Sequence, residues 1–324
     1  MLFRASYLGI DLGAEKINAA QLVNKGNNKI IKSLYQMENP IGDTVFSKPK
    51  EKAAIRQCLA KINKKFPSNN VVIGISSKLA MFRHVTLPLL NKKELKEAIF
   101  WEMQEFSTVL NSDYISDYEL LEKQKDTYRV LLVAVPKDII LDYIEVAGDA
   151  GFFLKALDVY PLANARVLRA QKKTDVTAII DLSSCNREVT IVDDGKIVFN
   201  RNLNISYNST TSKEIFNMIS TNTNLTDHTA SGLGFLSPPY KNLILEISRT
   251  FNFYTLQSKS RQIDEIVLIG QGSELQHCKD VLKRIFNTKV YTGKEFKYDF
   301  ISKNLVIDGN HLDFFSAIGF ALRG

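Results

Sequence analysis

Two stretches of the chain share one pattern of apolar and polar positions. Residues 7–13 and 178–183 are apolar runs that each contain Ile-Asp-Leu, and their aspartates are Asp11 and Asp181. A short polar turn follows each run, and a second apolar run follows at residues 17–23 and 188–192. Short runs of this kind, bounded by turn residues, predict two strands joined as a hairpin.

A turn signal and a third run complete each copy. The turns are Lys-Gly-Asn at residues 25–27 and Asp-Asp-Gly at residues 193–195, and the third runs are residues 30–31 and 197–199. Glycine and aspartate supply the positive φ that tight hairpin loops require. The two aspartates are 170 residues apart, about the length of one domain. The pattern therefore predicts two related lobes.

The segment between the two copies has a pattern of its own. Asn91, followed three residues later by Glu94, predicts a helix start, and apolar residues recur at helical spacing up to position 106. Residues 128–135 predict a strand and residues 139–150 a helix, after which Gly151 stands where helix ends favour glycine. We interpret residues 84–157 as an inserted α/β subdomain.

The second lobe continues beyond its first hairpin. Residues 202–231 are rich in Asn, Ser and Thr, which favours loops, whereas residues 243–254 have helical spacing and residues 263–269 predict a buried strand. That strand leads into Gly270-Gln271-Gly272, and Ser273 is the predicted cap of the next helix. The predicted division is residues 1–83 (lobe 1 core), 84–157 (inserted subdomain), 158–175 (return to lobe 1), 176–205 (lobe 2 core), 206–262 (lobe 2 peripheral subdomain) and 263–324 (lobe 2 core and closing C-terminal helix).

The composition is that of a globular chain. Its 324 residues are 45% hydrophobic and 24% charged, and no apolar run is long enough for a membrane helix. The net charge of +7 permits nucleic acid as a partner, but the lysines of residues 48–65 alternate with apolar residues, as on the outside of an amphipathic helix. We therefore expect no nucleic-acid partner. The cysteines Cys58, Cys185 and Cys278 lie far apart, which suits free thiols in a reducing compartment.

Two such hairpins have the chemistry to bind a nucleoside triphosphate from both sides. Backbone N–H groups of a turn can surround a phosphate, and an aspartate at a strand end can hold Mg²⁺ through water. A Gly-x-Gly turn lets a ligand approach the backbone closely. Taken alone, each aspartate is more often a turn-capping residue. The predicted nucleotide-binding residues are Gly13, Ala14, Glu15, Lys16, Ser183, Ser184, Gly270, Gln271, Gly272 and Ser273.

Further motifs follow one another in the order of a known family. Gly9-Ile10-Asp11-Leu12-Gly13 is similar to a first phosphate motif, and Leu87-Pro88 with Trp101-Glu102 is similar to the start of an inserted subdomain. Residues 158–163, residues 269–272 and the final Gly319-Phe320-Ala321-Leu322-Arg323 continue the agreement. In this order the motifs resemble the PilM family of type IV pilus assembly proteins over nearly the whole chain.

The resemblance implies a fold, ligands and partners. The fold is an α/β, actin-like (ribonuclease H-like) two-lobed fold with an inserted α/β subdomain, related to that of the cell-division protein FtsA. ATP and Mg²⁺ are the implied ligands of the interlobe cleft, with Asp11 as the Mg²⁺ ligand through water. The implied partners are the cytoplasmic tail of a PilN-like inner-membrane protein, held in a groove between the first lobe and the insertion, and other pilus assembly proteins. The implied location is cytoplasmic, at the inner face of the membrane, where the partner would hold the protein.

Three departures from the family pattern weaken the nucleotide motifs. Ala14-Glu15-Lys16 replaces small hydroxyl residues, Ser183 replaces a glycine, and Ala230-Ser231 with Gly234 stands where a glutamate and a lysine are expected. Each lost charged hydrogen bond costs roughly 1.5–3 kcal/mol. We therefore predict an adaptor with a degenerate ATP-binding cleft rather than an enzyme.

The main alternative is an active Mg-ATPase of the same machine. In that case Asp11 would organise Mg²⁺ and Asp181 would orient the attacking water, so these two aspartates are the catalytic candidates. An FtsA-like division protein is less favoured. A small-molecule kinase on the same fold is also less favoured, because such an enzyme needs a base facing a sugar pocket and we find no candidate.

Overall fold

The computed structural model describes most of the chain. The described residues are 6–26, 28–42, 46, 48–66, 70–110, 113–172, 175–183, 186–203, 238–258, 261–270, 276–292, 295–302, 305 and 311–324. The chain divides into two compact units, of which the first comprises Met1–Gln171, Tyr298–Val306 and Phe314–Gly324. The second comprises Lys172–Lys297 and Ile307–Asp313. The finer boundaries predicted from the sequence stay a prediction.

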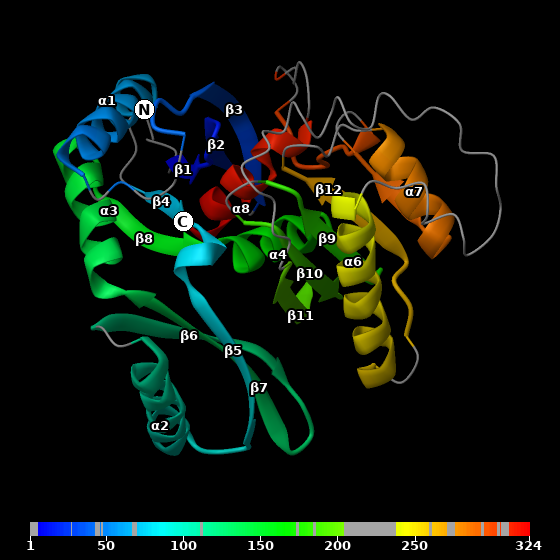
Figure 1. Ribbon diagram of the computed structural model, residues 1–324. Coiled ribbons are helices and arrows are strands. Elements are labelled where there is room, and N and C mark those ends of the chain that lie inside the picture. Colours follow the sequence, from blue (N-terminus) through cyan, green and yellow to red (C-terminus); the bar gives the residue numbers. More distant parts are fainter. Residues whose placement is uncertain are drawn as a thin grey trace. The chain divides into compact units, whose positions relative to one another are not determined.

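The first unit is built on a five-stranded sheet in the order β3-β2-β1-β4-β8 (Figure 1). β1 (Ser6–Leu12) pairs antiparallel with β2 (Lys16–Lys25), and β2 pairs antiparallel with β3 (Asn28–Glu38). On its other side β1 pairs in parallel with β4 (Val71–Ile75), which pairs in parallel with β8 (Leu154–Val159). The three strands predicted for the N-terminal copy are confirmed.

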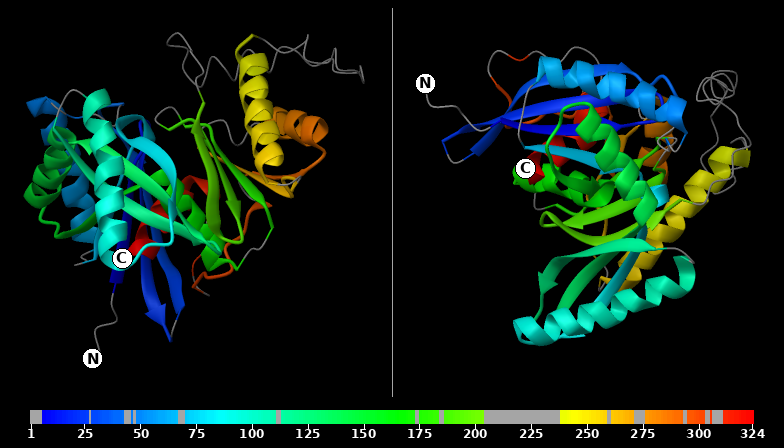
Figure 2. Two further views of the ribbon diagram at one scale, coloured as in Figure 1. Left: turned by 90° about the horizontal axis from the view of Figure 1, so that it is seen from below. Right: turned by 90° about the vertical axis from the view of Figure 1, so that its left-hand side faces the viewer.

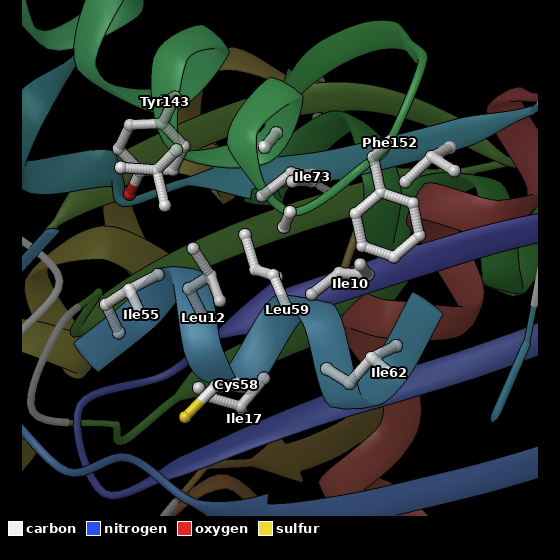
Figure 3. Close-up of a cluster of buried hydrophobic side chains, with 14 of the residues drawn as sticks. Ile10, Leu12, Ile17, Ile55, Cys58, Leu59, Ile62, Ile73, Tyr143 and Phe152 are labelled. Atoms are coloured by element: carbon white, nitrogen blue, oxygen red, sulfur yellow. The ribbon is translucent and has the colours of Figure 1, made fainter. Parts of the chain in front are cut away.

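Helices cover both faces of this sheet, which explains why β1 and β4 are almost uninterrupted apolar runs. α1 (Pro49–Lys65) and α3 (Lys137–Asp149) lie on one face. α1 buries Ile55, Cys58, Leu59 and Ile62 against the strands, at the spacing of one helix face (Figure 3). The amphipathic helix predicted from the lysine-rich segment is confirmed.

The C-terminal helix lies on the opposite face, so close that its backbone contacts the backbone of its neighbours. α4 (Tyr160–Ala170) and α8 (Phe315–Arg323) cover this face, and α8 contacts β1, β2 and β4. A Cβ atom on Gly9 would lie 2.0 Å from Ala317 O, and one on Gly319 would lie 2.2 Å from Ala163 O. The two glycines therefore allow α8 to pack directly on β1 and on α4.

The insertion is a three-stranded antiparallel sheet with one covering helix (Figure 2). It consists of β5 (Met81–Pro88), α2 (Lys92–Leu110), β6 (Tyr114–Lys123) and β7 (Thr127–Pro136), with strand order β5-β7-β6. α2 begins as predicted, because Asn91 Oδ1 accepts hydrogen bonds from the backbone of Lys93 and Glu94, at 3.0 and 3.1 Å. In return, Glu94 Oε2 accepts one from Asn91 N at 3.1 Å.

The second unit repeats the sheet of the first. Its order is β11-β10-β9-β12-β13, with the same parallel and antiparallel pairs. The strands are β9 (Thr177–Asp181), β10 (Glu188–Asp193), β11 (Lys196–Asn202), β12 (Glu265–Ile269) and β13 (Lys289–Tyr291). The predicted turn is confirmed, since Asp194 and Gly195 have φ of 49° and 69°. The internal duplication read from the sequence is therefore present.

Two further helices complete the described part of the second unit. α6 (Pro238–Gln257) packs Leu243, Ile247 and Phe251 against the strands, and α7 (Gln276–Phe286) packs Leu282 there. Short 3₁₀ helices occur at Ser77–Leu79 and His311–Phe314. Residues 206–237, which belong to the predicted peripheral subdomain, lie outside the described residues.

Candidate functional site

The penultimate position of β1 is occupied by Asp11. Asp11 is buried, and its carboxylate accepts hydrogen bonds from the Tyr160 hydroxyl, 2.6 Å from Oδ1, and from Asn18 Nδ2, 3.3 Å from Oδ2. Asn18 stands opposite Asp11 in the β1–β2 pair, and Tyr160 is the first residue of α4. Groups from two different elements therefore fix this carboxylate in position.

The predicted first phosphate turn follows Asp11, and a residue beyond the hairpin strands holds its backbone by hydrogen bonds. A Cβ on Gly13 would lie 2.7 Å from Lys16 O, so the turn itself requires glycine. Asn39 donates from Nδ2 to Gly13 O and from its backbone to Glu15 O, both at 2.8 Å. Glu15 is exposed, whereas Ala14 and Lys16 are half-buried. Asn39 thus holds the backbone of this turn at two carbonyl groups.

β9 ends at Asp181, the topological equivalent of Asp11. Asp181 is buried, and its Oδ1 accepts a hydrogen bond from Ser183 N at 2.8 Å. Burial raises the pKa of Asp181, because a low-dielectric environment disfavours the charged form, while hydrogen bonds from Ser183 and Asn186 act in the opposite direction. Glu188, also buried, stands opposite Asp181 in the β9–β10 pair, as Asn18 stands opposite Asp11.

Gly270 contacts this second turn directly. Its φ is +79°, and a Cβ there would lie 2.4 Å from Ser183 N and 2.6 Å from Asp181 Oδ1. The glycine is therefore required by the protein's own turn. Four predicted nucleotide-binding residues lie outside the described residues, and their assignment stays a prediction: Ser184, Gln271, Gly272 and Ser273.

The predicted joint action of the two halves also stays a prediction. Asp11 belongs to the first unit and Asp181 to the second, and each is described within its own unit. The departures at Ala230, Ser231 and Gly234 lie outside the described residues.

A groove of about 500 Å³ lies within the first unit, between β8, α3 and the insertion. We call it the β6–β8 groove. β6 and β8 are each the last strand of their sheet. The backbone groups on the outer side of an edge strand are available to a further extended segment. Its lining includes Ile115, Asp117, Glu119, Ile144, Phe153, Lys155 and Arg323.

The lining of the groove combines exposed apolar side chains with charges of both signs. Ile115, Ile144 and Phe153 are 43%, 49% and 79% exposed, which is unusual for three large apolar residues around one hollow. β6 contributes the exposed carboxylates Asp117 and Glu119. Charges of the opposite sign come from β8 and α8.

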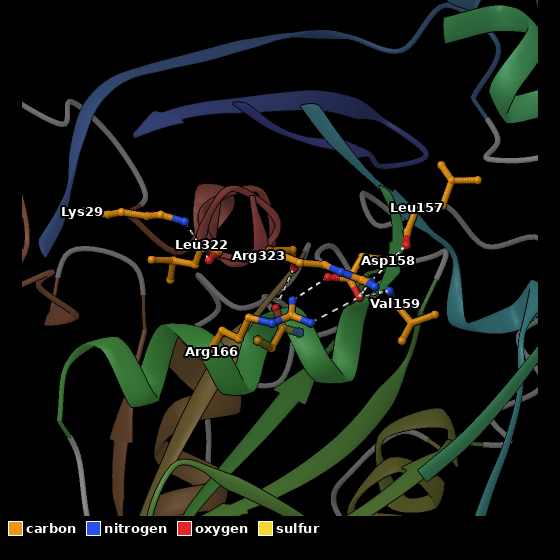
Figure 4. Close-up of polar contacts among 9 residues, drawn as sticks. Lys29, Leu157, Asp158, Val159, Arg166, Leu322 and Arg323 are labelled. Carbon is orange, nitrogen blue, oxygen red and sulfur yellow. Dashed lines mark hydrogen bonds and ion pairs between the residues drawn. The ribbon is translucent and has the colours of Figure 1, made fainter. Parts of the chain in front are cut away.

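Ion pairs around Asp158 fix the β8 side of the groove (Figure 4). The buried Asp158 pairs with Arg166 and with Arg323, whose Nη1 lies 2.8 Å from Asp158 Oδ1. Arg323 Nη1 also donates to Leu157 O at 3.1 Å. The last turn of α8 is therefore tied to β8, and Arg323 and the exposed Lys155 give this side a positive charge.

The same helix end binds a lysine of β3. Lys29 Nζ donates to Leu322 O at 3.1 Å and to Gly324 O (Figure 4). A cation near the C-terminal carbonyl groups is favoured by the helix dipole. Burial lowers the pKa of Lys29, and the nearby positive charges of Lys155 and Arg166 lower it further.

A family comparison decides the identity of the chain. The family model for the type IV pilus assembly protein PilM matches residues 9–324. The chain belongs to the PilM family. The resemblance read from the motifs of the sequence is thereby confirmed.

A solved structure shows the same fold. A chain of the PilM-PilN type IV pilus biogenesis complex matches with a TM-score of 0.78 and 20% identity, over 99% of this chain and 98% of that one. An actin-like ATPase-fold protein of unknown function from Bacteroides thetaiotaomicron matches with a TM-score of 0.46 and 12% identity, over 89% and 90% of the two chains. The ethanolamine utilization protein EutJ from Carboxydothermus hydrogenoformans matches with a TM-score of 0.46 and 13% identity, over 100% and 91%.

The predicted fold class is confirmed for this PilM-family chain. It has the α/β, actin-like fold, with a duplicated five-stranded sheet and an inserted α/β subdomain. A search of curated protein sequences gives no match. Within the described part of the chain, no helix is long and apolar enough to cross a membrane. Among the same residues, no group of three or more His, Cys, Asp or Glu is arranged to hold a metal ion.

Sequence reasoning missed several residues that build these sites in the PilM-family chain. Asn18 is opposite Asp11 because the hairpin register places it there, and counting back from the turn identifies it. Asn39 and the hydroxyl of Tyr160 reach Asp11 and its turn from other elements. Arg323 reaches β8 from the C-terminal helix. No local pattern marks these last three contacts.

Proposed function

We propose that this chain is a platform of a type IV pilus or a related assembly machine, where it holds the cytoplasmic tail of a PilN-like inner-membrane protein. Membership in the PilM family and a fold shared with a chain of the PilM-PilN complex support the proposal. The observation that carries it is the β6–β8 groove, an apolar hollow of about 500 Å³ between two strand edges. On this proposal the protein is cytoplasmic and meets the inner face of the membrane through its partner.

The shape of the groove suits an extended segment. A bound tail can add to a strand edge through backbone hydrogen bonds, while pockets receive alternate side chains. Successive side chains of an extended segment point to opposite sides. Ile115, Ile144 and Phe153 offer apolar contacts to one set of these side chains. Affinity on this proposal comes from the backbone pairing together with burial of apolar anchors.

The charges of the groove restrict which tail fits. β6 presents Asp117 and Glu119, whereas the β8 side presents Lys155 and Arg323. Opposite charges on facing groups favour one partner and one register over others. We therefore expect the tail to carry a basic side chain toward β6 and an acidic group toward β8.

Calorimetry with a peptide that copies the partner's cytoplasmic tail tests the proposal. We expect binding with one-to-one stoichiometry. Ile144→Glu places a carboxylate in the apolar lining and should weaken binding at least tenfold, which corresponds to about 1.4 kcal/mol. Leu141→Glu is the matched control, because Leu141 lies on the same helix with 51% exposure, close to the 49% of Ile144, but lines a different hollow.

Two outcomes separate the parts of the proposal. Absence of binding heat and of a thermal shift over a wide range of peptide concentration would refute the assigned function. Binding that Ile144→Glu and Leu141→Glu weaken equally would place the tail elsewhere. The charge arrangement has its own test. Glu119→Gln should weaken the binding of the wild-type peptide more than the binding of a peptide that lacks the basic residue.

Nucleotide binding is the second candidate, and the equivalence of Asp11 and Asp181 in the duplicated sheet favours it. A carboxylate held at the end of β1 fits a ligand of the Mg²⁺ water shell, and Gly13, Ala14 and Lys16 would then lie near a phosphate. Mg²⁺ supplies positive charge that offsets the phosphates. Ser183 and Gly270 would serve the second half. The exposed Glu15 adds like charge to an approaching phosphate, which weakens binding.

The adaptor and the ATPase give different results in one assay. We expect an adaptor with a degenerate cleft to bind Mg-ATP weakly in a thermal-shift assay. Hydrolysis of ATP in its presence should be no faster than in buffer alone. Steady hydrolysis by purified protein that Asp181→Ala abolishes would establish the ATPase instead. Asp264→Ala is the control, because Asp264 belongs to the same unit and its Oδ2 accepts a hydrogen bond from the backbone, from Val176 N at 2.8 Å.

A further inference from the structure

α2 exposes two neighbouring aromatic side chains outside the β6–β8 groove. Phe100 is 55% and Trp101 70% exposed, and their ring centroids are 5.8 Å apart in an edge-to-face arrangement. α2 lies against the insertion's sheet (Figure 2) and packs on it through Leu95 and Ile99. Helical spacing therefore places the aromatic pair on the other side of the helix. Adjacent exposed aromatic residues are typical of binding surfaces.

Charged residues flank the aromatic pair in two rows. Because successive residues of a helix turn by about 100°, residues four and seven positions earlier lie beside a given residue. Two lysines occupy these positions relative to Phe100, and two glutamates occupy them relative to Trp101. We name these six exposed residues the α2 face: Lys93, Glu94, Lys96, Glu97, Phe100 and Trp101.

The α2 face therefore has a basic row that ends in Phe100 and, beside it, an acidic row that ends in Trp101. The ion pairs that the described residues show on α2 join Arg83 to Glu102 and Glu105, which are not part of the face. Glu94 accepts a hydrogen bond from Asn91 N. Each row thus presents charge of a single sign to the solvent, positive in the basic row and negative in the acidic row.

We propose that the α2 face binds a second copy of this chain through the same face. A two-fold axis parallel to the helices sets the basic row of each copy against the acidic row of the other, and Phe100 against the partner's Trp101. A two-fold axis perpendicular to the helices would instead set basic row on basic row. The charge pattern therefore favours parallel helices. An anionic lipid surface suits the face less well, because the acidic row would oppose it.

The association is weak in free solution. An aromatic side chain buries roughly 150–250 Å², so the two partly exposed pairs together contribute on the order of 500 Å², whereas a stable interface needs about 1,200 Å². We therefore expect a monomer at low concentration and a dimer only at high concentration. Molecules held side by side at a membrane by their partners would associate more readily, because their effective concentration is higher.

The test uses the only tryptophan of the chain, Trp101, whose fluorescence reports directly on the α2 face. As the protein is concentrated from about 1 μM to about 1 mM, its emission should shift to shorter wavelength while sedimentation shows a dimer. Phe100→Gln should weaken this association at least tenfold. Leu256→Gln is the control, because Leu256 is 85% exposed on α6, and it should leave association unchanged.

Charge exchange tests the arrangement of the two rows. Lys96→Glu and Glu97→Lys should each weaken self-association at least tenfold, whereas an equimolar mixture of the two variants should associate as the wild type does. The proposal is overturned if concentration changes neither emission nor sedimentation, or if Phe100→Gln and the charge variants associate normally. An emission shift that occurs only with vesicles of anionic phospholipid would identify a membrane surface instead and would equally overturn it.

Discussion

The hydrogen bond from Tyr160 to Asp11 offers a sharp test of how the first unit is held together. Tyr160→Phe removes one hydroxyl and nothing else. The ring stays in edge-to-face contact with Phe320, at a centroid distance of 5.1 Å. The change leaves Asp11 Oδ1 without its 2.6 Å donor, while the bond from Asn18 to Oδ2 remains.

The expected cost follows from the burial of both groups. A hydrogen bond to a charged group contributes about 1.5–3 kcal/mol. Tyr160 is 2% and Asp11 8% exposed, so water replaces the lost donor poorly. We expect the free energy of unfolding of the first unit to fall by about 2 kcal/mol. With a urea dependence of about 1–3 kcal/mol per molar, the unfolding midpoint should fall by about 1 M.

Urea unfolding followed by circular dichroism measures this change, and hydrogen exchange of β1 peptides assigns it to the first unit. Tyr118→Phe is the matched control, because the Tyr118 hydroxyl has no hydrogen-bond partner among the described residues, and it should shift the midpoint little. In an Asp11→Asn background the same change should cost only about 0.5–1.5 kcal/mol, since the acceptor is neutral. Equal midpoints for Tyr160→Phe, Tyr118→Phe and the wild type would refute the reasoning.

Three further changes test other contacts. The pKa of Asp181 is raised in the folded state by burial. The stability that the protonated carboxyl contributes is therefore fully present below the unfolded pKa and is lost as pH rises through the folded pKa. Asp181→Asn should therefore raise stability at pH 7 and flatten its dependence on pH, and a profile parallel to the wild type would contradict this. Gly319→Ala should lower the free energy of unfolding by about 1–3 kcal/mol, because its Cβ would lie 2.2 Å from Ala163 O. Gly148→Ala has open space around its Cβ and should raise the free energy of unfolding by about 0.5–1 kcal/mol. Similar urea midpoints for the two variants would contradict this. Arg323→Met should cost about 1.5–3 kcal/mol and also weaken tail binding in calorimetry, and a variant with unchanged stability would show that Arg166 alone satisfies Asp158.

Local pattern was sufficient for several elements of this fold. The spacing of apolar residues identified the hairpins after Asp11 and Asp181, and the turn at Asp194 and Gly195 has the positive φ expected of it. The apolar spacing in α1 and the Asn91–Glu94 pair at the start of α2 also correspond to the structure. These features depend on residues within a few positions of one another, so a short window of sequence contains the information.

The sites were decided by tertiary structure. Tyr160 and Asp11 are 149 positions apart, and Arg323 and Leu157 are 166 apart, yet each pair forms a hydrogen bond. The β6–β8 groove exists because two strands from different sheets both end as edge strands around α3. The order of strands in a sheet depends on the whole chain, and neither periodicity nor turn chemistry specifies which distant side chains meet. The sequence by itself therefore determined the two matching hairpins, whereas the packing of α4, α8 and the insertion determined the groove and the setting of Asp11.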